Sequence, residues 1–189
     1  LVRALGRRGV KTRAILTRAG AEFVTALSLS ALTGDKIYSD LFSLTDEAEM
    51  GHIQLSRSAD LVVVAPATAD LMAKMANGLA NDLASTTLLA TDKRVLMAPA
   101  MNVRMWESAS VKRNRAQLEK DGVLFVGPND GEMACGEFGP GRMAEPMEIV
   151  AAIERALSAS GPLAGLTALV TAGPTREPVD PVRFLANHS

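Results

Sequence analysis

The chain has 189 residues, enough for one good-sized domain and a short appendage, with 48% hydrophobic and 22% charged residues. Its formal net charge of -1 provides no basic surface for a nucleic acid or an anionic membrane, and no apolar run approaches the ~20 residues that span a bilayer. A single cysteine excludes an internal disulfide and fits a protein of the reducing cytoplasm.

Short apolar runs rich in β-branched residues alternate with helical patterns. Residues 1–5 already have helical spacing without a preceding cap, so we expect a strand and a loop upstream of them. Buried parallel strands are predicted for four runs: 14–16, 61–65, 95–98 and 123–126. Amphipathic helices are predicted through Leu71, Met72, Met75 and Leu79, and through Ile149, Val150, Ile153 and Leu157. The alternation predicts an α/β, doubly wound (Rossmann-like, flavodoxin-like) parallel sheet with helices on both faces and its first strand missing.

The pattern breaks after residue 157. Ser158 begins a Ser/Gly/Pro-containing stretch that is typical of a linker. We therefore predict a first domain over 1–157, a linker over 158–165 and the start of a second domain over 166–189. In that second part, 166–170 predicts a buried strand, and Asp180-Pro181 predicts the start of a helix.

Several catalytic motifs are absent from the sequence. It has no Gly-x-x-x-x-Gly-Lys phosphate loop, no Gly-x-Gly-x-x-Gly dinucleotide loop and no Gly-x-Ser-x-Gly nucleophile elbow. One cysteine and two histidines cannot supply a usual zinc site. In doubly wound folds ligands bind at the carboxyl ends of the strands, so the residues that follow each strand are the candidates.

Two candidate segments directly follow strands. In the run 65–70, small residues allow a planar or phosphorylated ligand to approach, and Thr68 offers a hydroxyl near a helix start. The alternative is that Thr68 or Asp70 simply caps the helix. In the run 98–102, the Asn102 amide can bind a carboxylate or a flavin edge, or Asn102 can be an ordinary turn residue.

Two further candidates carry titratable groups. His52 suits proton transfer or carboxylate binding, although a lone histidine can also be structural. The glycine-rich run 131–143 predicts a mobile loop that covers a site. Cys135 within it can act as an acid or nucleophile, and the alternative is a buried, inert thiol.

Together, four of these features resemble the homo-oligomeric flavin-containing cysteine decarboxylases, with the nearest likeness to phosphopantothenoylcysteine decarboxylases: His52, Pro-Ala-Met-Asn at 99–102, Ala-Cys-Gly at 134–136 and Gly-Pro-Gly-Arg-Met at 139–143. The likeness covers about residues 1–157. The tail 171–189 resembles the opening of phosphopantothenate–cysteine ligases, which bacteria commonly fuse to the decarboxylase.

The resemblance implies FMN as cofactor and decarboxylation of N-phosphopantothenoylcysteine to 4'-phosphopantetheine in coenzyme A biosynthesis. Oxidation of the substrate thiol by FMN makes the carboxylate able to leave, because the resulting carbanion is delocalised onto sulfur. The attached ligase implies CTP and Mg2+ for the part beyond this chain. The family also implies trimers or higher homo-oligomers, a cytoplasmic location, a small-molecule substrate, and neither nucleic-acid nor membrane binding.

Residue roles follow from the same resemblance. The catalytic residues are Cys135 as proton donor, His52 near substrate and flavin, and Asn102, which also holds the substrate carboxylate. The other implied contacts are Glu132, Met133 and Ala134 to the substrate, Thr17 to the FMN phosphate, Thr68, Ala69, Asp70 and Ala100 to the flavin, and Asn187 to the substrate of the ligase part. Many relatives carry Asn where this chain has Asp70.

Three other functions remain open on this fold. A decarboxylase of peptide C-terminal cysteines would share His52 and Asn102, but the ligase-like tail favours the small substrate. A non-catalytic regulatory flavoprotein would not need Cys135. A flavin prenyltransferase would have no role for the Cys135 segment.

Overall fold

The computed structural model describes residues 1–39, 52–132, 136–158, 176–178 and 184–186, without the side chains of residues 52 and 53 or those of the two last segments. The chain divides into two compact units, residues 1–159 and 160–189.

The centre of the first unit is a parallel sheet of β3 (Val62–Ala67), β4 (Val95–Pro99) and β5 (Leu124–Phe125), in the order β3-β4-β5. A second parallel pair is formed by β1 (Ala14–Ile15) and β2 (Ile37–Tyr38). All four predicted runs form parallel strands and β2 is added, but of these strands only β4 is buried along its whole length, since β1 is half-buried and β3 and β5 contain exposed residues. The predicted doubly wound α/β class is therefore correct.

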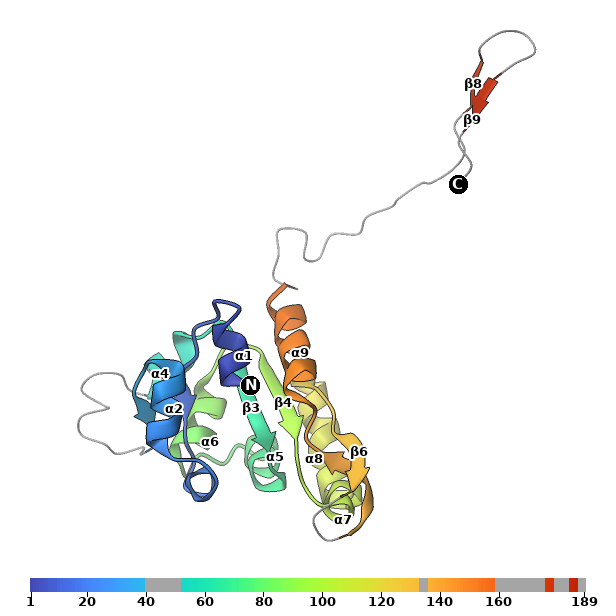
Figure 1. Cartoon of the computed structure of the whole chain (residues 1–189). Helices are drawn as coiled ribbons and strands as arrows, with labels where there is room; N and C mark the ends of the chain where they lie inside the picture. The colour runs from blue at the N-terminus through green and yellow to red at the C-terminus, as the bar shows by residue number, and fades with distance from the viewer. Residues whose placement is uncertain (40–51, 133–135, 159–175, 179–183, 187–189) are drawn as a thin grey trace. The chain divides into compact units, whose positions relative to one another are not determined.

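Helices surround this sheet (Figure 1). Their bounds are α1 Val2–Gly6, the 3-10 helix η1 Gly20–Glu22, α2 Ala26–Thr33, α4 His52–Arg57, α5 Ala69–Ala76, α6 Leu83–Ala90, α7 Val103–Glu107, α8 Ala109–Lys120 and α9 Pro146–Ser158. The two predicted amphipathic helices correspond to α5 and α9, but α5 ends at Ala76, so Leu79 lies beyond it and is 54% exposed.

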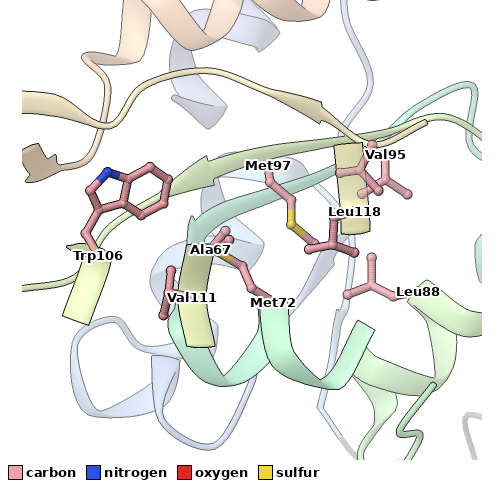
Figure 2. Packing of buried hydrophobic residues seen from close by; sticks show 9 residues of the cluster. Ala67, Met72, Leu88, Val95, Met97, Trp106, Val111 and Leu118 are labelled. Atoms are coloured by element: carbon pink, nitrogen blue, oxygen red, sulfur yellow. The ribbon is translucent and has the colours of Figure 1, made fainter. Parts of the chain in front are cut away.

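Strand β4 separates two apolar cores. All five of its residues are buried, and they alternate between the faces because successive side chains of a strand point to opposite sides. Val95 and Met97 join a cluster with α5 and α8 that includes Met72, Val111 and Leu118 (Figure 2). On the other face, the second cluster is contributed mainly by β4, α1 and α9: Leu96, Ala98, Leu5, Ile149, Val150 and Ile153.

Most of the glycine-rich run 131–143 forms paired strands and not the predicted loop. Residues Asn129–Glu132 (β6) pair antiparallel with Phe138–Arg142 (β7). Gly139 has φ +150°, an extended conformation that glycine adopts readily and other residues rarely do. Glycine thus permits an extended ribbon here, and residues 133–135 lie outside the described part.

In the second unit, β8 (Arg176–Pro178) pairs antiparallel with β9 (Phe184–Ala186). The predicted helix from Asp180 is therefore wrong over residues 184–186, where ladder hydrogen bonds to β8 outweigh a local capping signal. The predicted strand at 166–170 and Asn187 lie outside the described residues.

A charged cluster joins helices α5 and α6. Lys74 Nζ, on a side chain only 17% exposed, lies 2.7 Å from Asp82 Oδ2 and 3.0 Å from Asp70 Oδ2. Asp82 also caps α6, since its Oδ1 accepts a 2.8 Å hydrogen bond from the Ser85 backbone N–H. Partial burial raises the pKa of Asp82, but hydrogen bonds from Lys74 and Ser85 outweigh this and lower it overall. Hydrogen bonds to Asp82 and then Asp70 raise the pKa of Lys74.

We predict that Asp82→Asn reduces the pH dependence of stability in acid. The pKa of Asp82 is lower folded than unfolded, so its ionised form stabilises the fold above the unfolded value of about 3.9, and this is lost as pH falls through the folded pKa. Asn still caps a helix, so the variant removes the ion pair selectively. Near pH 7 we expect a loss of about 0.2–1 kcal/mol, typical of partly exposed pairs, in urea unfolding.

The matched control is Asp92→Asn, because Asp92 is 68% exposed and pairs only loosely with its neighbour Lys93 at 3.4 Å. Urea unfolding of both variants from about pH 7 to about pH 2 compares the two positions. Equal pH profiles for the Asp82 variant and the native chain would contradict the stabilising role of this cluster.

Candidate active site

The segments that follow β3 and β4 lie side by side. Ala67 is the register partner of Pro99, and the Ala100 backbone N–H donates to the Ala67 carbonyl at 3.1 Å. Since both strands run in the same direction, Thr68 and Asn102 emerge at the same edge of the sheet. The structure thereby brings together two of the candidate segments predicted from the sequence.

The β3 segment combines small residues with a helix cap. Ala65 and Pro66 are exposed at the strand end, and Ala69 is half-buried. Thr68 caps α5, its Oγ1 accepting from the Leu71 backbone N–H at 3.3 Å. The cap interpretation is therefore correct for Thr68, whose hydroxyl still carries a proton to donate.

Asp70 is not the cap of this helix. It lies in the first turn of α5 and pairs with Lys74 at 3.0 Å, with its own side chain 71% exposed. A carboxylate here cannot donate a hydrogen bond as an amide could. Any contact of Asp70 with a flavin edge would therefore differ from that of an asparagine.

The β4 segment holds Asn102 in a defined orientation. Its Oδ1 accepts from the Arg104 backbone N–H at 2.7 Å, which makes Asn102 the cap of α7. Its Nδ2 donates to Glu137 Oε2 at 2.7 Å, and Arg104 Nε lies 3.3 Å from Glu137 Oε1. The amide nitrogen of Asn102 thus already faces a carboxylate, which is the kind of group it is predicted to hold.

The β6–β7 ribbon is docked against the start of α7. The Met101 N–H donates to the Gly141 carbonyl at 3.0 Å. A Cβ at Gly139 would lie 3.2 Å from Val103 Cγ1, so glycine is needed for this close approach. Glu132 ends β6 as an exposed residue. The ribbon therefore brings Glu137, two residues beyond position 135, next to Asn102.

The remaining candidates are placed only in part. His52 is the first residue of α4, and its side chain lies outside the described part of the structure. Met133, Ala134 and Cys135 lie outside it too. Thr17 follows β1 in the other sheet, where its Oγ1 accepts from the Gly20 backbone N–H at 3.0 Å.

Two functional candidates were missed by sequence reasoning, Glu137 and Arg104. Glu137 lay within the glycine-rich run and Arg104 followed the Pro-Ala-Met-Asn motif by two positions. In the sequence, the only indication that either residue is functional was its position beside these motifs. The pairing of Glu137 with Asn102 depends on a contact between positions 35 residues apart, which local patterns do not encode.

The residues at this edge fit a planar flavin. Exposed Ala65 and Pro66 and half-buried Ala100 put little side-chain bulk at the strand ends. The Thr68 hydroxyl offers a donor beside them, whereas the Thr17 hydroxyl follows β1 of the other sheet. Among the residues the structure describes, no group of three or more His, Cys, Asp and Glu could hold a metal ion. None of the helices described there has both the length and the apolarity needed to cross a bilayer.

Comparisons with known proteins agree with this geometry. The flavoprotein family model matches residues 1–158. A second model, the DNA/pantothenate metabolism flavoprotein C-terminal domain, matches residues 163–189. The chain is similar to the coenzyme A biosynthesis bifunctional protein CoaBC of Vibrio vulnificus (strain YJ016), with 47% identity over 189 residues, which are 100% of this chain and 47% of that protein. It thus spans about half the length of the curated relatives it matches.

Two solved structures share the fold. One is a mutant PPC decarboxylase complexed with pantothenoylaminoethenethiol, with a TM-score of 0.69 and 29% identity, covering 82% of this chain and 87% of the other. The other is the FMN-dependent cysteine decarboxylase SpaF, with a TM-score of 0.66 and 32% identity, covering 80% and 83%. The match over residues 1–158, on a parallel sheet whose strand ends carry the candidate site, shows that this chain belongs to the flavoprotein family.

Proposed function

We propose that this chain catalyses the FMN-dependent decarboxylation of N-phosphopantothenoylcysteine to 4'-phosphopantetheine in coenzyme A biosynthesis. The observation that carries the proposal is the orientation of Asn102, whose Nδ2 points at a carboxylate beside the small-residue edge of β3 and β4. The relatives named above support the substrate class, since one is a coenzyme A biosynthesis protein and another binds a pantothenoyl enethiol.

The flavin, when bound, would take two electrons from the substrate thiol, which makes loss of carbon dioxide possible, and would return them to the resulting enethiol. Asn102 holds the substrate carboxylate through Nδ2, which fixes the bond that breaks. Thr68 and Thr17 donate hydroxyl protons to the cofactor, and Ala69, Asp70 and Ala100 line its edge. His52 acts near the substrate, and Glu132, Met133 and Ala134 cover it.

Cys135 is proposed as the acid that supplies the proton when the enethiol left by decarboxylation is reduced to the product thiol. It is the only cysteine in the chain. The solved PPC decarboxylase whose complex contains an enethiol is a cysteine-to-serine mutant. A missing proton donor would leave the enethiol unreduced, and an enethiol bound to a cysteine mutant is consistent with this.

We further propose the organisation of the larger protein. Residues 1–157 would be the decarboxylase domain, 158–165 a linker and 166–189 the start of a ligase domain that joins phosphopantothenate to cysteine with CTP and Mg2+. The bifunctional relative and the second family match support this division. We place the protein in the cytoplasm, consistent with its single cysteine.

A second candidate function is decarboxylation of a C-terminal cysteine on a peptide, which the likeness to the cysteine decarboxylase SpaF favours. It would use His52 and Asn102 in the same way. Activity on a peptide ending in cysteine, with none on N-phosphopantothenoylcysteine, would favour it over our first proposal.

We predict that Asn102→Ala lowers kcat/KM for N-phosphopantothenoylcysteine by about tenfold to hundredfold, the effect of losing a hydrogen bond to a charged group. Carbon dioxide release and the flavin spectrum report activity and FMN binding separately. The variant should bind FMN like the native protein.

The matched control is Asn81→Ala, because Asn81 is an exposed loop residue that belongs to neither of the segments that follow β3 and β4. It should leave kcat/KM unchanged. Full activity of Asn102→Ala, or native protein that neither binds FMN nor releases carbon dioxide, would contradict the proposed function.

We predict that Cys135→Ser still releases carbon dioxide but accumulates the enethiol in place of 4'-phosphopantetheine. A hydroxyl gives up its proton far less readily than a thiol, so only the final reduction of the enethiol, which needs that proton, should fail. Mass spectrometry distinguishes the two products, since the enethiol has two hydrogens fewer. Normal product formed at an unchanged rate would show that Cys135 is not the acid.

We also propose that copies of this chain assemble through the surface of η1 and α2, as trimers or larger homo-oligomers. None of the eight residues of α2 is buried. Phe23 is 92% exposed and Leu27 is 81% exposed. Covering a large apolar side chain contributes about 1.5–3 kcal/mol, so burial of both by a second copy is a sizeable stabilisation.

We predict that the double substitution Phe23→Ser and Leu27→Ser lowers the molar mass measured by light scattering, because the interface loses its apolar contacts. Leu89→Ser is the control, since Leu89 is also exposed, at 56%, but lies on α6. A native protein that is monomeric, or a double variant with unchanged mass, would rule out this interface.

A further inference from the structure

Three alternate residues of one ribbon edge contact the start of α7. The Gly141 carbonyl accepts from Met101, Gly139 packs on Val103, and the Glu137 carboxylate accepts from Asn102. Residues two apart on a strand lie on the same side. Glu137, directly before β7, therefore lies on the same side of the ribbon as Gly139 and Gly141. The contact of Glu137 with Asn102 is therefore part of how the ribbon is held on α7.

This contact and the cap of α7 together hold both polar atoms of the Asn102 amide. Its Oδ1 is committed to the Arg104 backbone N–H at 2.7 Å, and its Nδ2 donates to Glu137 at 2.7 Å. A hydrogen bond from an amide to a carboxylate is charge-assisted and short, hence stronger than one between neutral groups. An amide nitrogen carries two hydrogens, so one nitrogen can donate to Glu137 and to a second carboxylate at once.

The ion pair with Arg104 contributes less. The Arg104 side chain is 84% exposed and its Nε lies 3.3 Å from Glu137 Oε1. Exposed pairs of this kind contribute little because both ions stay hydrated. The partner of Glu137 that matters for the site is therefore the half-buried Asn102.

We propose that Glu137 is a positioning residue for substrate recognition: its carboxylate orients the Asn102 amide so that Nδ2 meets the carboxylate of the incoming substrate. This inference rests on the proposed function, in which Asn102 holds that carboxylate. Glu137 acts through Asn102 and touches neither the thiol nor the flavin. Its loss should weaken only ligands that carry the carboxylate.

The test compares two ligands by equilibrium calorimetry on the FMN-loaded protein. N-phosphopantothenoylserine keeps the carboxylate but has no thiol to be oxidised, and 4'-phosphopantetheine lacks the carboxylate. Glu137→Ala should weaken binding of the serine analogue by about tenfold to hundredfold, while binding of 4'-phosphopantetheine stays unchanged. Glu137→Gln, which keeps an acceptor oxygen for Asn102, should lose less than Glu137→Ala.

The control and a double-mutant cycle separate positioning from general damage. Glu107→Ala makes the same chemical change on an exposed residue of α7, the helix that Asn102 caps. It should leave both affinities unchanged. In an Asn102→Ala background, Glu137→Ala should have no further effect on the serine analogue, because its effect passes through Asn102. If Glu137→Ala fails to fold, the same cycle with Glu137→Gln decides.

Three outcomes would overturn the inference: native affinity for the serine analogue in Glu137→Ala, an equal loss for both ligands, or tighter binding of the serine analogue. The last would mean that Glu137 competes with the substrate for Asn102. Failure of the proposed function looks different, since the native protein would then bind neither ligand and release no carbon dioxide.

Discussion

The pairing of β3 with β4 is the constraint on which the site depends. It aligns Ala67 with Pro99 and joins the two following segments by the hydrogen bond from Ala100. The pairing is held in place because β4 is buried on both faces, with Met97 in one core and Leu96 in the other. Rigid strands beneath the site let short loops hold polar groups in fixed positions.

Both loops end in a residue that caps a helix. Thr68 and Asn102 each commit a side-chain oxygen to a backbone N–H of the helix that follows. The commitment fixes the side chain, so that the hydroxyl proton of Thr68 and the amide nitrogen of Asn102 remain the groups that can donate. Capping and ligand binding are thus compatible uses of one residue, and the two interpretations weighed from the sequence do not exclude each other.

The glycine-rich ribbon links this edge of the sheet to the cysteine proposed as the acid. Glycine at 139 lets β7 approach Val103 closely, and this contact places Glu137 on Asn102. The group proposed to hold the substrate carboxylate is therefore oriented by a residue from a distant part of the chain. A substitution in the ribbon can then alter carboxylate recognition without touching the flavin contacts.

The sequence by itself determined the fold class, the strands of the parallel sheet and the two amphipathic helices, because burial on both sheet faces and on one helix face leaves a periodic apolar pattern. It also indicated Thr68 and Asn102, because ligand sites follow strands in this fold. It failed at the ribbon and at the helix predicted from Asp180, where pairing with another strand outweighs local preference. Only the tertiary structure decided that Glu137 meets Asn102, since a hydrogen bond across 35 residues depends on how β7 docks on α7 and leaves no periodic trace in the sequence.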